Sequence, residues 1–386
     1  MRTLGVVTVG RSDYGIYQPI LKRIASDPAL KLLLFVGGMH LSKEFGLTVK
    51  AIESDGYKKC ERVKMLVSSD TPEAISKSMG MGLIGFAQAY RRSRPDILVV
   101  LGDRFEMHAA ALAALPFNIP VAHIHGGELT QGAIDDALRH SMTKLSHLHF
   151  VSTKEYARRV EQLGEEKWRI TVSGAPSLDN LKSMPLLDRP VLAKILKVKL
   201  TPPPLLVTFH PVTLEHTRAA WQAGELLAAL KTSGLPVIFS LPNADTGGRI
   251  IRAMIEKYAR QNDLASICDN PGIQNYFSLM KLAAAMVGNS SSGIIEAPSV
   301  KLPVVNVGSR QAGRVRAKNV IDVDGRREEI LSGIRRAISD KFRSGLKVLC
   351  NPYGDGHAAE RIVRRLKGVE LNDRLIRKTF QDMVKK

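Results

Sequence analysis

Residues suited to proton transfer lie close together in the middle of the chain, in His123-Ile-His-Gly-Gly-Glu128 and in the nearby Asp135-Asp136 and Arg139-His140. Imidazoles and carboxylates can exchange protons near neutral pH, so they are suited to general acid–base catalysis. The two glycines let the backbone turn tightly or approach a ligand closely. The segment continues an apolar run that starts at Pro120. Because open α/β sheets bind ligands at the carboxyl ends of their strands, we expect proton-transfer chemistry at this strand end.

Apolar runs and helical patterns alternate along the first half of the chain, and they predict the elements that position these residues. The runs at 3–9, 30–36, 97–101, 120–125 and 148–152 predict buried strands. Helices are expected at 16–24, after a glycine-flanked loop from Gly10 to Gly15, at 72–92 and at 135–146. That loop lacks the Lys-Ser/Thr pair of a P-loop and a full G-x-G-x-x-G, although Arg11 could reach an anion there. An alanine-rich helix that ends at about 115 is expected to have Asp103 at its N-terminus, where the alternative to a functional role is an ordinary N-cap. The alternation predicts a parallel, doubly wound sheet.

The second half of the chain has the same pattern without a detectable sequence repeat. Strands predicted at 205–209, 236–241, 283–287 and 303–307 are followed by polar segments that begin at His210, Pro242-Asn243, Gly288-Asn289 and Gly308. Thr201-Pro-Pro-Pro204 is typical of a linker, so we place a domain boundary in that region.

A candidate anion site follows the third of these strands, at Asn289-Ser-Ser-Ser-Gly293. Free amides, hydroxyls and the helix dipole would favour a phosphate at a helix N-terminus, and the alternative is an ordinary serine N-cap. The negative charge of Glu296 would repel a phosphate, whereas its carboxylate could accept hydrogen bonds from the two hydroxyls of a ribose. The alternative is a solvated glutamate on the surface.

The bulk composition limits the class of protein. The chain has 386 residues, 44% of them hydrophobic and 24% charged, which predicts a globular protein of two domains or slightly more. The net charge of +19 could favour binding of nucleic acid, of an anionic membrane or of an anionic small substrate. The basic residues are dispersed and form no tract interleaved with aromatic residues, so we expect neither nucleic-acid nor membrane binding. The 3 scattered cysteines and the absence of a signal-peptide pattern favour a reducing, cytoplasmic location. We expect no cofactor and no metal.

Several motifs in this order and spacing resemble those of the hydrolysing UDP-N-acetylglucosamine 2-epimerases, from Arg11 to the tail at Asn351-Pro-Tyr-Gly. They are Gly102-Asp-Arg-Phe-Glu106, His123 to Glu128, Asp135 to Lys144, His210-Pro-Val-Thr213, Asn289 to Gly293, and Arg310-Gln-Ala-Gly-Arg314. These enzymes supply N-acetylmannosamine or a related sugar for sialic-acid-like nonulosonates.

The resemblance implies a GT-B fold of two Rossmann-like domains with the active site in the interdomain cleft. We expect an N-terminal, sugar-side domain at 1–180, a UDP-binding domain at 205–350 and a helical tail at 351–386 that packs back on the N-terminal domain. The implied reaction eliminates UDP across C1–C2 to give a 2-acetamidoglucal, and water then adds with inversion at C2. A homo-oligomer, either a dimer or a tetramer, is also expected.

The resemblance also assigns roles by position. Asp103 and Asp135 match acid/base carboxylates, and His210 matches the histidine beside the diphosphate. Contacts to the diphosphate and substrate are implied for Arg11, Arg104, Ser290, Ser291 and Arg310, contacts to the nucleoside for Asn243 and Glu296, and a sugar-side contact for His40.

The chain departs from some members of the family, which have Glu at the position of His125. The base that removes the C2 proton is therefore either His125 or Glu128. The loop from Glu128 to Asp135 is also one residue longer than in those members.

Three other functions stay open. They are a non-hydrolysing epimerase, a GT-B glycosyltransferase, and a sugar-nucleotide sensor or nucleic-acid binder without catalysis. The sequence does not decide between N-acetylglucosamine and a 4-amino-6-deoxy relative such as diacetylbacillosamine as the sugar.

Overall fold

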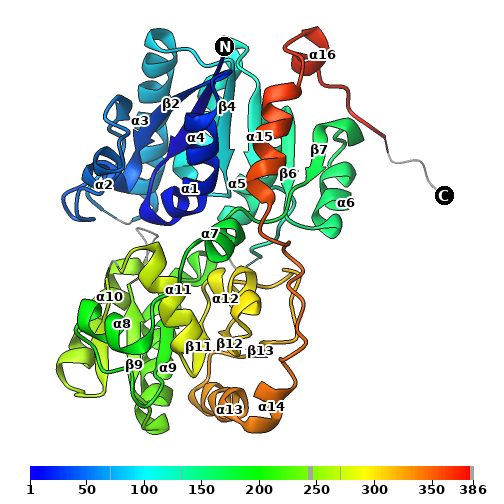
Figure 1. Cartoon of the computed structure of the whole chain (residues 1–386). Coiled ribbons are helices and arrows are strands. Elements are labelled where there is room, and N and C mark those ends of the chain that lie inside the picture. The colour runs from blue at the N-terminus through cyan, green and yellow to red at the C-terminus, as the bar shows by residue number, and fades with distance from the viewer. Residues whose placement is uncertain (70, 132, 242–246, 270, 383–386) are drawn as a thin grey trace. The chain divides into compact units, whose positions relative to one another are not determined.

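The structure is a computed structural model that describes residues 1–69, 71–131, 133–241, 247–269 and 271–382. It divides into two compact units (Figure 1). Unit 1 comprises Met1–Glu128, Asp135–Lys182 and the residues from Tyr353 onward, and unit 2 comprises Leu129–Ile134 and Ser183–Pro352. Across the described ranges, no helix is both long and apolar enough to span a bilayer.

Unit 1 is built on a parallel sheet of seven strands in the order β3-β2-β1-β4-β5-β6-β7. The strands are β1 (Arg2–Thr8), β2 (Leu30–Gly37), β3 (Cys60–Val63), β4 (Ile97–Leu101), β5 (Val121–Ile124), β6 (Leu148–Val151) and β7 (Ile170–Val172). The strand order reverses between β1 and β4, where Val6 lies opposite Leu34 of β2 and Val99 of β4. Such a reversal is the usual ligand-binding edge of an open α/β sheet.

Helices connect these strands. They are α1 (Arg11–Ser26), η1 (Gly38–Leu41), α2 (Val49–Ser54), α3 (Pro72–Arg92), α4 (Phe105–Ala114), η2 (Leu115–Phe117), α5 (Asp135–Leu145), α6 (Lys154–Gln162), η3 (Lys167–Arg169) and α7 (Ser177–Ser183). The later helices α15 (Ala358–Gly368) and α16 (Asp373–Ile376) return to this unit, where α15 packs against α1. The start of α3 follows from its sequence, because the Thr71 side chain accepts from the Ala74 amide and Pro72 occupies the first turn.

The prediction of a loop from Gly10 to Gly15 is wrong, because α1 begins at Arg11. The carboxylate of Asp13, in the first turn, accepts hydrogen bonds from Thr8 Oγ1 at 2.6 Å and from the Val9 amide at 2.9 Å. These bonds join the end of β1 to the first turn of the helix and give the Val9 amide, which lies between them, a hydrogen-bond acceptor. The two flanking glycines therefore do not mark a loop.

Unit 2 contains a parallel sheet of six strands in the order β10-β9-β8-β11-β12-β13. The strands are β8 (Leu205–Thr208), β9 (Val237–Ser240), β10 (Ala265–Ile267), β11 (Ala285–Gly288), β12 (Val304–Val307) and β13 (Val320–Val323). The helices are α8 (Arg189–Leu196), η4 (Thr213–Arg218), α9 (Ala219–Ser233), α10 (Gly248–Arg260), α11 (Ile273–Leu282), α12 (Ser292–Ile295), η5 (Ala297–Val300), α13 (Arg327–Ile338) and α14 (Asp340–Ser344). The predicted fold class, two doubly wound parallel α/β domains, is confirmed.

Candidate active site

The guanidinium of Arg139 connects three candidate groups of unit 1. Arg139 lies on α5 with its side chain 2% exposed, and its Nη2 donates to Oδ2 of Asp103, which follows β4. Its Nη1 donates to the carbonyl of His125 at 2.8 Å and lies 3.6 Å from Oε2 of Glu128. A planar guanidinium can satisfy several acceptors at fixed angles, so Arg139 sets the positions of these groups relative to one another.

His125 and Glu128 form a buried pair with Ser152. The distance from Nδ1 of His125 to Oε1 of Glu128 is 2.6 Å, and Ser152 Oγ donates to the same carboxylate oxygen at 2.9 Å. With the proton on Nδ1, the imidazole donates to Glu128 and its Nε2 carries the lone pair. In the described ranges, Nε2 has no hydrogen-bond partner. The φ of His125 is +67°, a backbone conformation that residues other than glycine rarely adopt and that is often found at functional sites.

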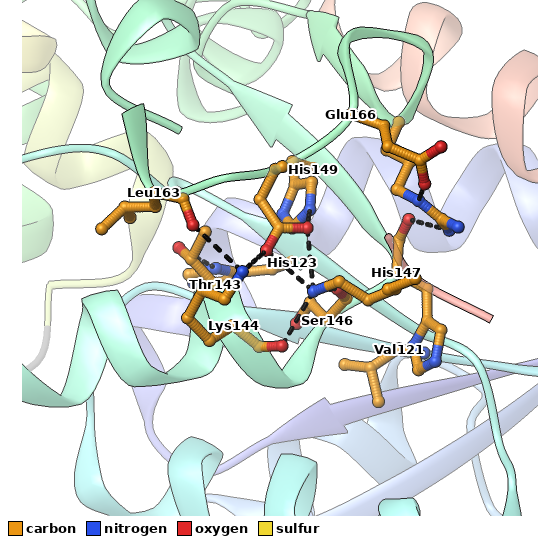
Figure 2. Close-up of polar contacts among 12 residues, drawn as sticks. Val121, His123, Thr143, Lys144, Ser146, His147, His149, Leu163 and Glu166 are labelled. Atoms are coloured by element: carbon orange, nitrogen blue, oxygen red, sulfur yellow. Dashed lines mark hydrogen bonds and ion pairs between the residues drawn. The ribbon is translucent and has the colours of Figure 1, made fainter. Parts of the chain in front are cut away.

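His123 supports the backbone beside Asp103. Its Nε2 lies 2.8 Å from the Gly102 carbonyl. Its Nδ1 lies 3.3 Å from Thr143 Oγ1 (Figure 2). Burial lowers the pKa of His123 to about 3, so the ring is neutral and its Nε2–H donates to the carbonyl. This geometry makes His123 a support for the Gly102-Asp103 turn.

His40 uses both ring nitrogens inside unit 1. Nε2 lies 2.9 Å from Thr8 Oγ1, Nδ1 lies 2.7 Å from Thr48 Oγ1, and the residue is buried. Burial lowers the pKa of His40 to about 4, so the ring is neutral. A hydrogen bond from the ring to a sugar would require one threonine contact to break. The predicted sugar contact of His40 stays a prediction.

The other candidate groups of unit 1 lie at the starts of helices. Arg104 donates from Nε and Nη2 to the two carboxylate oxygens of Glu106, both at 3.1 Å. Arg11 and Asp135 are the first residues of α1 and α5. Their predicted contacts with substrate stay predictions.

In unit 2, Asn289 binds the backbone of His210 on both sides. Its Oδ1 accepts from the His210 amide at 2.7 Å, and its Nδ2 donates to the His210 carbonyl at 2.8 Å. Arg310 donates to the Asn289 carbonyl at 3.2 Å. Gly288 has a φ of +134°, and a Cβ there would clash with the carbonyl of Thr208. The end of β11 is thus fixed against β8 with His210 and Arg310 beside it.

The predicted anion segment lies at the start of the short helix α12. The Ser292 amide donates to Ser290 Oγ at 3.3 Å, and the two side-chain oxygens are 3.4 Å apart. Burial raises the pKa of the phenol of Tyr276 on α11. Ser291 and Glu296 flank α12 at its two ends. Asn243 lies outside the described residues.

The sequence placed Arg139 and Asn289 in candidate segments but assigned no contact to either side chain, and Ser152 was not among the candidates. The role of Arg139 could have been inferred from its position, since it lies one helical turn after Asp135 and faces the same side of α5. No pattern in the sequence pointed to Ser152, because its contacts with His125 and Glu128 join β6 to the end of β5. Within the described ranges, no group of three or more His, Cys, Asp or Glu residues could hold a metal.

Comparison with known proteins gives consistent matches. The family described as UDP-N-acetylglucosamine 2-epimerase matches residues 22–367. A "GDP/UDP-N,N'-diacetylbacillosamine 2-epimerase (hydrolyzing)" from Campylobacter jejuni is 39% identical over 99% of each chain. A "UDP-N,N'-diacetylbacillosamine 2-epimerase (hydrolyzing)" from Legionella pneumophila is 37% identical over 98% of this chain and 99% of the relative. The structure of a Neisseria meningitidis UDP-GlcNAc 2-epimerase bound to UDP-GlcNAc is similar in fold, with a TM-score of 0.79 at 17% identity over 95% of this chain and 99% of that one.

Proposed function

Because this chain belongs to the UDP-N-acetylglucosamine 2-epimerase family, we propose that it converts a UDP-2-acetamido sugar and water into UDP and the free sugar inverted at C2. The observation that carries the proposal is the site of unit 1, where one arginine holds Asp103 beside a buried His125–Glu128 pair. Two relatives that match almost the whole chain are named as hydrolysing 2-epimerases, which supports hydrolysis over return of UDP to the sugar.

In the first step, a base removes the proton from C2 of the sugar. The C–H electron pair becomes the C1=C2 double bond, and the C1–O bond breaks with its electrons leaving on the diphosphate. We assign the diphosphate contacts to unit 2, where Arg310 and the hydroxyls of Ser290 and Ser291 offer a cation and donors. Charge that develops on the leaving group is stabilised by such preorganised donors.

We assign the C2 base to His125 and an orienting role to Glu128. Glu128 is 1% exposed, and its carboxylate already accepts from His125 and Ser152 and lies close to Arg139. A carboxylate bound to Nδ1–H fixes the tautomer and leaves Nε2 to accept a proton. The imidazole that replaces the glutamate of other family members can therefore take over the same proton transfer.

In the second step, water adds across the C1=C2 bond of the glucal. The hydroxyl joins C1, and a proton joins C2 on the face opposite to the one that lost it. We assign the acid/base work of this step to Asp103 and Asp135. Arg139 orients Asp103, and His210 of unit 2 is assigned to the diphosphate side.

We propose a 2,4-diacetamido sugar of the diacetylbacillosamine type as the preferred substrate, since both relatives described above are named for it. UDP-N-acetylglucosamine is the second candidate, because the family is named for it.

Proton NMR of the purified protein with each UDP-sugar in heavy water tests these assignments. Free 2-epimer deuterated at C2, together with UDP, is the expected product. A UDP-linked epimer would move the protein to the non-hydrolysing branch, and transfer of the sugar to an added acceptor without deuteration would indicate a glycosyltransferase. The ratio of kcat/KM for the two sugars tests the substrate preference.

We also propose that the protein is a homo-oligomer in a reducing, cytoplasmic compartment. On α3, Met81 and Ile84 are 51% and 58% exposed, and Leu83 between them is also exposed. Exposed apolar groups on one helix are typical of a protein interface. Light scattering of the wild type and of Ile84→Glu tests the interface, since the charge should dissociate the oligomer. The three cysteines are free, as expected in a reducing compartment.

A further inference from the structure

The C-terminal arm, defined here as residues 372–381, packs against segments of unit 1 that are distant from it in sequence. It contains α16 and continues to Gln381 in the red part of Figure 1. The buried guanidinium of Arg169 donates to the carbonyls of Arg374 and Leu375 at 2.8 Å and of Arg377 at 3.0 Å. These bonds fix the start of the arm beside β7.

Lys378 extends from this arm to the C-terminal end of α5. Its ammonium donates to the carbonyl of Lys144 at 2.8 Å, to the carbonyl of Ser146 at 2.6 Å and to Oε1 of Glu165 at 2.9 Å. The last carbonyls of a helix have no donors within the helix and carry partial negative charge, so a cation stabilises them. Lys378 therefore caps α5 from a segment more than 230 residues later in the chain.

Glu165 holds Lys378 in this position. Its side chain is fully buried and also accepts from Lys144 Nζ at 2.6 Å and from His149 Nε2 at 3.0 Å. Burial alone would raise the pKa of Glu165, but the hydrogen bonds from His149, Lys144 and Lys378 outweigh it and lower the pKa to about 2. The carboxylate is thus ionised and fixes the two ammonium groups at the end of α5.

The end of the arm adds a second contact to the same region. The ring of Phe380 lies 4.9 Å from the Lys144 ammonium, and the amide of Gln381 donates to the Gly164 carbonyl at 3.0 Å. A Cβ on Gly164 would lie 2.5 Å from the Phe380 ring, so glycine lets the ring approach the backbone here. The arm therefore covers the junction between α5 and the loop that carries Glu165.

Helix α5 carries Asp135 and Arg139 in its N-terminal half, and its Thr143 contacts His123. Arg139 in turn holds Asp103 and the backbone of His125. One end of α5 thus contacts the candidate acid/base groups, and the other end is held by Lys378. A shift of about 1 Å in such groups can lower turnover by a factor on the order of 100.

We propose that Lys378 is a positioning residue, which fixes α5 so that Arg139 and Asp135 are placed for the reaction. The inference rests on the proposed function. Lys378 does not belong to the apolar core of unit 1, and its side chain is 18% exposed. Without the ammonium, Glu165 keeps its hydrogen bonds from Lys144 and His149, so removal of Lys378 should loosen α5 without unfolding the unit.

The test compares Lys378→Met with the control Arg377→Met. Both remove one positive charge from adjacent positions, but the Arg377 side chain is 81% exposed and pairs only with the equally exposed Asp373 in the described ranges. Lys378→Met should lower kcat by about 10-fold to 100-fold while KM changes by less than about 3-fold. Hydrogen exchange should accelerate at residues 135–145 and not in β1 to β4. Arg377→Met should match the wild type, and Lys378→Arg, which keeps the cation and its donors, should recover part of kcat.

Each result supports or overturns the proposal. Unchanged exchange in α5, or unchanged kcat despite faster exchange there, would overturn it. A rise in exchange throughout unit 1 would show that Lys378 serves overall stability instead. If the wild type acts on neither UDP-sugar, the proposed function fails, whereas exchange in α5 still decides whether Lys378 fixes the helix.

Discussion

Arg139 donates a hydrogen bond to the carboxylate of Asp103, and this bond joins α5 to the end of β4. The two residues are 36 positions apart in sequence and come from neighbouring layers of unit 1. Because the same guanidinium also binds the carbonyl of His125, the three residues form one unit whose geometry depends on α5.

Asp103→Asn should reduce release of free sugar by a factor on the order of 100 to 10,000, the range that general acid–base groups contribute. The amide keeps the shape of the side chain but cannot exchange the proton. UDP affinity, measured by calorimetry, should stay the same because the diphosphate contacts are assigned to unit 2. Near-normal turnover would remove Asp103 from the mechanism.

His125→Gln and Glu128→Gln should differ in the exchange of the C2 proton. If His125 is the base, His125→Gln should abolish deuterium incorporation at C2 in heavy water. Glu128→Gln should retain slow incorporation, because the imidazole remains but loses the carboxylate that orients it. The reverse order of the two variants would assign the base to Glu128.

Arg310→Ala should weaken UDP binding by about 10-fold, which corresponds to about 1.4 kcal/mol. Arg310 donates to the carbonyl of Asn289, and the side chain of Asn289 donates to the carbonyl of His210. The guanidinium of Arg310 supplies positive charge to the proposed diphosphate site. Calorimetric titration with UDP measures the effect. Unchanged affinity would show that this loop does not contact the nucleotide.

The free energy of unfolding should fall as the pH decreases from about 6.5 toward 4. Burial lowers the pKa of His40 and His147 to about 4 and of His123 to about 3. In this window the unfolded chain binds protons that the folded protein excludes, so each such histidine costs about 1.4 kcal/mol per pH unit. Asp13 acts in the opposite direction, because burial raises its pKa to about 6, and so does Asp179, whose pKa burial also raises. The three histidines outnumber these two carboxyl groups. Urea unfolding at pH 7 and pH 5 measures the slope, and equal stability at the two values would contradict the prediction.

Gly288→Ala should destabilise the protein by about 4 kcal/mol, from backbone strain combined with the clash against β8. Its φ is +134°, and the new methyl group would meet the carbonyl of Thr208. Gly272→Ala is the matched control, since Gly272 also has a positive φ of +76° but has open space around it. Thermal unfolding should show a much smaller loss for the control. Equal losses would mean that strain alone, and not contact with Thr208, makes glycine necessary.

The sequence alone determined the fold class and most of the strands, but β3, β7, β10 and β13 were not predicted. Helix α3 and strand β4 have the predicted bounds, because periodic burial and strong end signals are local properties of the chain. The motifs also identified the family, since their order and spacing follow directly from the residues. The prediction was wrong at Gly10 to Gly15, where hydrogen bonds of Asp13 with β1 extend the helix beyond what the local pattern indicates.

Only the tertiary structure decided which residues touch. The contact of Ser152 with His125 and Glu128, the contact of Asn289 with His210 and the contact of Lys378 with the end of α5 join segments that are distant in sequence. Parallel strands bring their carboxyl ends to one edge, but strand order depends on crossovers that local patterns do not encode. Residue types therefore predicted which chemistry the chain can perform, whereas the choice of His125 as the proposed base required the buried partners that fold around it.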